Sequence, residues 1–339
     1  MDSSREQSVK EIRKLQVTTG GTYIITIPKE WAENLGVGRG SPLSMVLENN
    51  EITIVPGDQR TSMESRTIDA DSLKNRKFLE LSIVASYVQG HDITQVSSSS
   101  GRKHDWKKWA REAVSEIMGV EIFEEYSDRI LLQNLVDPHK FDLMGMLEKF
   151  SGNSALVLTD AVSSLLNGNR EVAEDAFQRG KDLTRNYRLL MRLVMLASRD
   201  KGLRMEYGIG SVSSLIVTAI AVREMGRIAY YSMRTAEHVL EIGRPAEDAI
   251  GKLVARMEKV TREMQRKAFF SLITRNMNAA SQVIDTMTVV REIYEEIHGS
   301  ENFLQLENQL SWELIVRDIR AVAGYAVALA DDAILGMFS

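Results

Sequence analysis

The second half of the chain contains only helical patterns, and it decides the fold more than any other part of the sequence. Beyond Pro138, apolar residues recur at helical spacing in six segments separated by glycine, proline or asparagine. The segments predict helices over residues 140–166, 170–199, 211–242, 246–272, 276–298 and 304–336. Helices of this length with short connections bury their apolar faces against one another, so the pattern predicts an antiparallel bundle.

The helical half also repeats itself. Residues 222–231 align with residues 316–325 without a gap, and the alignment keeps a valine, an arginine, an acid, an alanine and a tyrosine in step. A weaker match joins the two preceding helices. Two three-helix units packed together would bury apolar faces that neither unit could bury alone, so we expect a tandem of three-helix bundles, about 138–243 and 244–339.

The segment before the bundle alternates between helical and strand patterns. It predicts a small α/β unit, preceded by a polar linker or extended connection over residues 57–72. The expected elements are helices over 72–89 and 106–118 and strands over 93–99, 121–126 and 129–135.

The first 58 residues alternate short β-rich runs with turns. Gly20-Gly21 joins two such runs into a predicted hairpin, and Pro28 suits the start of a short helix that stops at Gly36. A second hairpin is expected from Pro42–Glu48 and Glu51–Val55 around Asn49-Asn50.

This order resembles the AbrB/SpoVT/MazE family of swapped-hairpin DNA-binding domains. The match rests on Gly21, Ile24–Pro28 and Leu35–Val37. The resemblance implies a homodimer whose basic first strand and following helix face DNA, which on this chain are the positions of Arg13, Lys14, Lys29 and Arg39. Where family members often carry an arginine pair in that helix, this sequence has Ala32 and Glu33.

The helical half resembles the PhoU family of phosphate-signalling proteins. Residues 223–229 and 235–237 are similar to a family helix written R-x-L-E-R-I-A-D-H-x-x-x-I-A-E. The resemblance implies a role in phosphate signalling through a protein partner. An AbrB-like head joined to a PhoU-like tail looks like proteins known from archaea.

PhoU proteins commonly bind metal clusters through acids spaced E/D-x-x-x-D, and this chain departs from that pattern. Gly226 and Tyr230 occupy the acidic positions of the first repeat, and Arg320 and Gly324 those of the second. We therefore expect no metal site and no cofactor. Three further acids share one helix face and are either a solvated surface, the favoured interpretation, or a residual cation site: Glu171, Asp175 and Asp182.

Composition narrows the functional classes. The net charge of −5 argues against an indiscriminate nucleic-acid binder, so any DNA surface must be a local cluster built by dimerisation. The absence of cysteine excludes disulfides and thiolate metal sites, and the scattered histidines form no helical zinc motif. No catalytic motif and no long apolar run occurs, which predicts a cytoplasmic non-enzyme without membrane insertion.

One basic segment has two interpretations. Residues 102–111 hold five permanent cations and two tryptophans. They could bind phosphate or nucleic acid, or Trp109, Ile117 and Met118 could face the core while Lys103, Lys107 and Arg111 form a solvated stripe. The second interpretation is favoured.

The sequence as a whole predicts a multidomain α+β protein. Residues 1–58 form a DNA-binding and dimerisation head, 59–137 a small α/β unit, and 138–339 a PhoU-like six-helix region. The expected function is a phosphate-uptake or phosphate-homeostasis regulator that binds DNA through its head and relays a signal through its tail. The alternative is a dimeric adaptor that does not bind DNA and whose tail docks on a transporter or kinase.

Overall fold

The computed structural model divides the chain into two compact units. It describes residues 10–48, 51–56, 63–99, 105–243, 245 and 249–338. The first unit spans residues 1–62, the head, and the second unit spans residues 63–339. The second unit therefore contains both the small α/β segment and the helical region.

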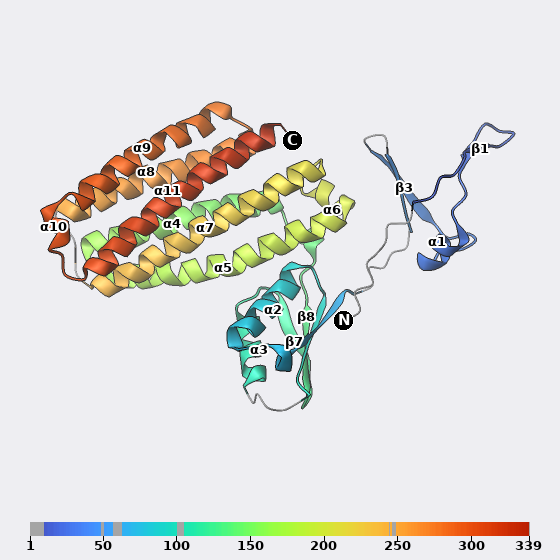
Figure 1. The fold of residues 1–339 in the computed structure, drawn as a ribbon, viewed down its shortest axis with the longest axis horizontal. Coiled ribbons are helices and arrows are strands. Elements are labelled where there is room, and N and C mark those ends of the chain that lie inside the picture. The colour runs from blue at the N-terminus through green and yellow to red at the C-terminus, as the bar shows by residue number, and fades with distance from the viewer. Residues whose placement is uncertain are drawn as a thin grey trace. The chain divides into compact units, whose positions relative to one another are not determined.

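The head consists of two antiparallel hairpins and one short helix (Figure 1). The turn of the first hairpin holds Gly21 at φ 83°, in the left-handed region that glycine adopts at least cost. Pro28 stands directly before the helix, as predicted, and its carbonyl accepts the first helical hydrogen bonds. The expected Asn49-Asn50 turn lies outside the described residues. The elements are β1 (Gln16–Val17), β2 (Tyr23–Ile24), α1 (Lys29–Asn34), β3 (Leu43–Glu48) and β4 (Glu51–Pro56).

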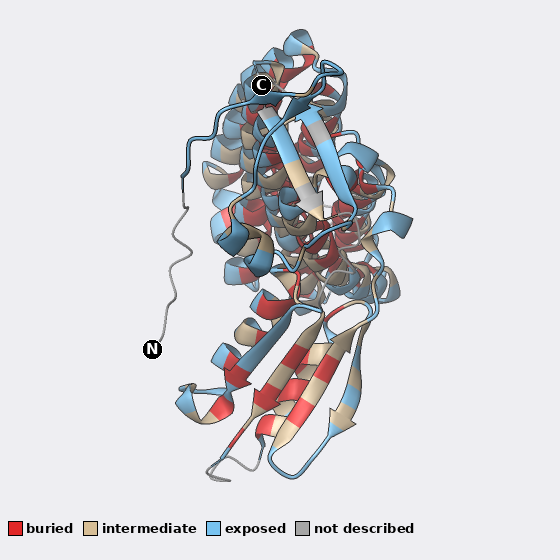
Figure 2. Ribbon diagram, turned by 90° about the vertical axis from the view of Figure 1, so that its right-hand side faces the viewer, coloured by how far each residue is buried: buried red, intermediate tan, exposed pale blue. Residues whose placement is uncertain are grey.

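The head differs from the rest of the protein in how little of its surface is buried. None of the head residues whose burial is described is buried within the chain (Figure 2). Twelve of its large apolar side chains are exposed, from 38% for Ile27 to 87% for Ile12. The exposed set is Ile12, Leu15, Val17, Tyr23, Ile24, Ile25, Ile27, Leu35, Leu43, Met45, Leu47 and Ile52.

The second unit begins with a four-stranded sheet in the order β5-β6-β8-β7. Strands β5 and β6 are parallel, and the other pairs are antiparallel. The side chains of Val96, Ile130 and Leu132 are buried and belong to the core shared with α2 and α3. The elements are β5 (Ser65–Asp69), α2 (Arg76–Val88), β6 (Ile93–Ser97), α3 (Trp106–Ser115), β7 (Val120–Glu125) and β8 (Arg129–Asn134).

The predicted linker over residues 57–72 is wrong in its second half. Residues 57–62 lie outside the described residues, but Ser65–Asp69 pair with β6 as an edge strand, and a short 3-10 turn follows at Ala70–Ser72. The strand looks like a linker in the sequence because only Ile68 among its residues is buried. An edge strand with one buried residue has little apolar periodicity to detect.

Eight α-helices follow in the described part of the chain, and the six long ones agree closely with the predicted segments. They are α4 (Leu143–Asn167), α5 (Arg170–Arg199), α6 (Lys201–Glu206), α7 (Val212–Ile242), α8 (Ala249–Thr274), α9 (Met277–His298), α10 (Glu301–Leu304) and α11 (Gln309–Met337) among the described residues. The short α6 was not predicted; the Asp200 side chain caps it by accepting from the Leu203 amide at 3.1 Å. The predicted helix 304–336 is divided because Asn308 adopts φ 57° before α11.

The long helices form a bundle in which α7 and α11 lie side by side (Figure 1). Helices α4, α5 and α7 form the first repeat, and α8, α9 and α11 form the second. The two repeats meet along α7 and α11, where the rings of Tyr231 and Tyr325 stack at 5.7 Å and 20°. The sequence alignment of the repeats pairs these two tyrosines. The stacked rings therefore lie where equivalent positions of the two repeats meet.

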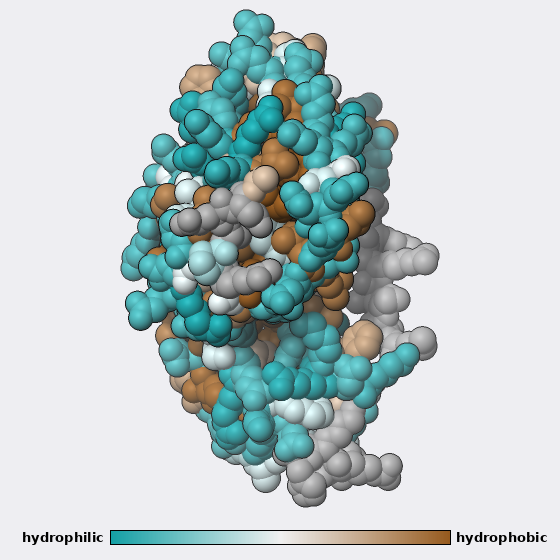
Figure 3. Space-filling model, turned by 90° about the vertical axis from the view of Figure 1, so that its left-hand side faces the viewer, coloured by the Kyte–Doolittle hydropathy of each residue, from teal (hydrophilic) through white to brown (hydrophobic). Residues whose placement is uncertain are grey.

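The described residues include no candidate membrane-spanning helix. None of their helices combines the length and apolar character that a bilayer span requires. The face drawn in Figure 3 is mainly hydrophilic, with apolar side chains showing in patches between polar ones.

Candidate functional site

The four cations expected to face DNA are all exposed on the head. Arg13 and Lys14 precede β1, Lys29 begins α1, and Arg39 follows that helix. Two of them are ion-paired: Arg13 lies 2.7 Å from Glu11, and Lys29 lies 3.5 Å from Glu33. Exposed pairs of this kind add little stability, but they reduce the positive charge available to phosphates.

The basic segment 102–111 is largely a packed helix with a paired surface. Residues 102–104 lie outside the described residues. Trp106 is buried, and Trp109 packs against the core. Lys107 and Arg111 both pair with Glu125 on β7, at 3.4 and 2.8 Å. This geometry supports the solvated-stripe interpretation for the described part of the segment.

Two of the four positions at which the PhoU resemblance implies metal-binding acids, Gly226 and Arg320, are occupied by packing groups. A side chain at Gly226 would place its Cβ 2.6 Å from the ring of Tyr187, so this position accepts only glycine without rearrangement. Arg320 instead covers the ring of Tyr294 at 4.5 Å. Among the described residues, no group of three or more potential metal ligands is present.

The acidic face of α5 is solvated. Glu171, Asp175 and Asp182 are exposed, and two of them pair within their own helix, Asp175 with Arg179 at 2.7 Å and Asp182 with Arg185 at 3.7 Å. Helical ion pairs account for Asp175 and Asp182, and Glu171 is exposed to solvent. The geometry favours the surface interpretation over a residual cation site.

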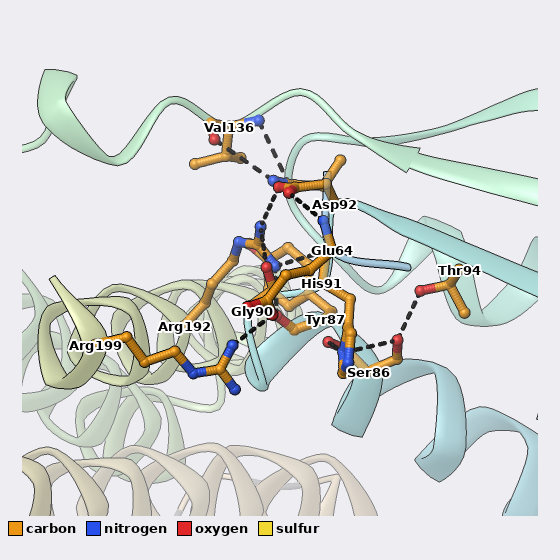
Figure 4. Close-up of polar contacts among 11 residues, drawn as sticks. Glu64, Ser86, Tyr87, Gly90, His91, Asp92, Thr94, Val136, Arg192 and Arg199 are labelled. Carbon is orange, nitrogen blue, oxygen red and sulfur yellow. Dashed lines mark hydrogen bonds and ion pairs between the residues drawn. The ribbon is translucent and has the colours of Figure 1, made fainter. Parts of the chain in front are cut away.

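A buried arginine joins the sheet unit to the bundle (Figure 4). Arg192 of α5 is 1% exposed. Its guanidinium donates to three backbone carbonyls at and beyond the end of α2, those of Tyr87 at 2.6 Å, His91 at 3.0 Å and Gly90 at 3.2 Å. The last carbonyls of a helix have no intrahelical partner and carry partial negative charge, so a cation placed there stabilises the helix end.

The surroundings of Arg192 show why the contact is specific. Burial lowers the pKa of Arg192, and the Asp92 carboxylate at 3.5 Å opposes that effect. The guanidinium also lies over the ring of Tyr87 at 5.0 Å. Gly90 has φ 98°, and a Cβ there would lie 2.8 Å from Leu196. The helix end, the glycine and α5 therefore fit one another closely.

Two outer ion pairs extend the same junction along α5. Arg199 pairs with Glu64 at 2.5 Å (Figure 4). Arg188 donates to the carbonyl of Glu116 and lies 3.8 Å from its carboxylate. We name Arg188, Arg192 and Arg199 with their partners the α5 junction. It positions the sheet unit on the first three-helix repeat.

The α5 junction was missed in the sequence. The available signal was Arg192 itself, a permanent cation within the apolar run Leu189-Leu190-Met191-Arg192-Leu193-Val194. A charged residue at a core position requires a buried partner. The partners are backbone carbonyls about a hundred residues earlier, and backbone groups leave no trace in residue identities.

Comparisons with known proteins agree with this arrangement. Residues 16–62 match the family model described as antidote-toxin recognition MazE, bacterial antitoxin. The crystal structure of PhoU from Pseudomonas aeruginosa matches with a TM-score of 0.50 and 14% identity, covering 58% of this chain and 96% of that one. The phosphate transport system regulatory protein PhoU from Streptococcus pneumoniae matches with a TM-score of 0.46 and 15% identity, covering 59% and 96%. No curated protein matched the sequence.

These matches confirm both resemblances at the level of domain and fold. The family model covers the hairpins and α1 of the head, and the first structural match extends over nearly all of that PhoU chain. The protein thus joins a MazE-antitoxin-like domain to a helical region with the fold of PhoU.

Proposed function

We propose that the protein is a cytoplasmic, non-catalytic regulator that binds DNA as a dimer and relays a phosphate-related signal through its helical region. The observation that carries the proposal is the union of a MazE-like head, unburied within one chain, with a PhoU fold. In a dimer, the head supplies two copies of each of its four cations, and the helical region supplies a surface for a signalling partner.

The exposure of the head supports dimerisation. Twelve large apolar side chains lie open to solvent in a segment with no buried residue among those whose burial is described. Each fully buried aliphatic side chain contributes about 1.5–3 kcal/mol, so a second copy of the head would supply most of its missing core. Two copies would also double the set of Arg13, Lys14, Lys29 and Arg39 to about eight cations, a number typical of phosphate-contacting surfaces.

The dimer can be tested with a single apolar-to-acid change. We expect the full chain to sediment at twice its 38.1 kDa mass and Ile25→Asp to sediment as a monomer. The helical circular dichroism should be retained, because the second unit has its own core. The control is Leu156→Asp, the same change at a half-exposed position of α4, which should stay dimeric. A monomeric wild-type protein at micromolar concentration would contradict the proposed assembly.

DNA binding is tested by titrating the full chain into fluorescent duplexes. One duplex carries the sequence upstream of its own gene, and the other has the same composition in shuffled order. We expect the logarithm of the association constant to fall linearly with the logarithm of salt concentration, because bound phosphates release counterions. No salt-dependent binding to either duplex would remove the DNA half of the proposal.

A second candidate is the adaptor that binds no DNA, and the ion pairs of the head favour it. Arg13 with Glu11 and Lys29 with Glu33 each consume a cation of the expected surface. In that case the head serves only to dimerise, and a transporter or kinase docks on the helical region. Retained dimerisation without DNA binding, together with a partner captured by the second unit, would support the adaptor.

The phosphate half is tested separately from the DNA half. Transcript levels of phosphate-transport genes should respond to external phosphate in the wild-type strain and lose that response when the gene is deleted. An unchanged response would leave the DNA-binding head without a phosphate-related role.

A further inference from the structure

Helices α7 and α11 lie against each other along a contact that we call the seam. A pair of polar side chains lies on each side of its centre, at equal distances, and the two pairs are related by the repeat. The stacked Tyr231 and Tyr325 mark that centre. Seven residues away along each helix, about two turns, the alignment of the repeats pairs Glu224 with Asp318 and His238 with Asp332. Because the helices are antiparallel, Asp318 meets His238 at one end of the seam and Glu224 meets Asp332 at the other.

The Asp318 end is surrounded by basic groups. Asp318 is fully buried, and its Oδ1 accepts from Arg317 at 2.8 and 3.1 Å. Its Oδ2 lies 3.6 Å from Nε2 of His238, and Arg234 lies 3.0 Å from that same nitrogen. Three basic side chains therefore surround one buried carboxylate, as a buried charge requires.

At the opposite end of the seam, two of the three basic side chains that surround Asp318 have no basic equivalents. Asp332 stands where the repeat has His238, and Ala328 stands where it has Arg234. Asp332 is only 9% exposed, and within the described part of the chain the Oδ2 atoms of Asp332 and Asp318 both lack a hydrogen-bond partner. The two ends differ because Arg317 donates to the other oxygen of Asp318 and His238 lies near that carboxylate. By the antiparallel register, Glu224 of α7 lies at the level of Asp332 of α11, and its negative charge acts on Asp332, at a place where the related site holds an acid and a base.

We propose that Glu224 and Asp332 form a proton-binding site in the seam and that its protonation controls how tightly the two three-helix repeats pack at that end. With the proton bound, Asp332 is neutral and tolerates burial. Without it, two negative charges oppose each other between α7 and α11. The proposal does not depend on DNA binding or on dimerisation.

The charged groups around the site support uptake of one proton. Burial raises the pKa of Asp332 to about 6, and the negative charges of Glu224 and the adjoining Asp331 add to the effect. Burial also raises the pKa of Glu224, while Arg223 and Arg227 on α7 oppose that rise. Among the described residues, helices α4 and α5, which pack on α7, and helices α8 and α9, which pack on α11, add no charged group acting on either carboxyl.

The direction of the pH effect follows from the raised pKa. Because Asp332 binds its proton more tightly in the folded state than in the unfolded chain, the protonated form adds stability that is complete below pH 3.8. That contribution is lost as the pH rises through about 6. At pH 8 the folded protein therefore carries an uncompensated buried charge.

The test compares thermal unfolding of the full chain at pH 5 and pH 8. Asp332→Asn removes the charge but keeps the shape, so it should raise the melting temperature at pH 8 by about 3–6 °C. At pH 5 the rise should be roughly half as large, because pH 5 lies between the ordinary pKa of 3.8 and the raised pKa of about 6. The control is Asp331→Asn, the exposed neighbour, which should change the melting temperature much less than Asp332→Asn at either pH, because Asp331 acts on the site only through its charge. After correction for the base-catalysed intrinsic rate, hydrogen-exchange protection of residues 329–337 should be lower at pH 8 than at pH 5 in the wild type but not in Asp332→Asn.

Two results would overturn the proposal. An equal effect of Asp332→Asn at both pH values would show that the side chain does not titrate in this range. Stabilisation of the wild type at pH 8 by Mg²⁺ or Mn²⁺, absent in Asp332→Asn, would show that the carboxyl pair holds a metal ion instead of a proton.

Discussion

Replacing Arg192 with leucine is expected to lower the free energy of unfolding of the second unit by about 2–4 kcal/mol. Leucine fills much of the space but leaves three buried carbonyls at the end of α2 without a donor. The loss is partly offset, because burying the arginine itself is costly, as its lowered pKa indicates. Chemical denaturation of the full chain measures the change.

The matched control for Arg192 is Arg199→Leu on the same helix. Arg199 pairs with Glu64 but is 42% exposed, and exposed pairs contribute about 0–1 kcal/mol. Arg192→Lys should lie between the two, because one ammonium group cannot reach all three carbonyls at once. If Arg192→Leu were no more destabilising than Arg199→Leu, the α5 junction would not hold the sheet unit in place.

Removing the four head cations should abolish specific and nonspecific DNA binding alike. In the full chain, replacing Arg13, Lys14, Lys29 and Arg39 with glutamine removes about eight charges from a dimer, which predicts at least a ~100-fold loss of affinity near 0.1 M salt and a nearly flat salt dependence. Fluorescence anisotropy with the upstream duplex measures both, and sedimentation verifies that the dimer persists.

The control removes the same charge from the bundle, at four exposed lysines, and should keep affinity within a few-fold. These are Lys149, Lys181, Lys252 and Lys259. The reverse change also tests the head: Glu33→Gln frees Lys29 and should strengthen binding. Equal losses in the two four-residue variants would show that net charge, and not the head surface, drives association.

The bundle was predictable because its signals are local and long. Helix α5 has the predicted bounds, 170–199, since Asn169 caps its start and Asp200 follows its end. The repeat paired Tyr231 with Tyr325 in the alignment, but the stacking of their rings was not predicted. The division of the last helix did not, because Asn308 at φ 57° breaks a pattern whose apolar spacing continues through it.

The functional residues were predictable only where the sequence carries a family pattern or an exposed charge. The four head cations came from a resemblance and remain a prediction for their role. Arg192 and Asp332 escaped notice because each is defined by what lies opposite in space: backbone carbonyls for Arg192 and Glu224 for Asp332. Strand β5 was missed for the same reason, since its partner strand and not its own composition makes it a strand.

The exposed apolar side chains of the head have a consequence for how the protein responds to its own concentration. If its core forms only when two chains meet, folding of the head is second order in protein concentration, and the amount of assembled head rises with the square of the chain concentration when chains are scarce. Occupancy of a promoter would then rise more steeply than in proportion to the amount of chain that the cell makes. A twofold change in synthesis of the chain would change the assembled head about fourfold in that range.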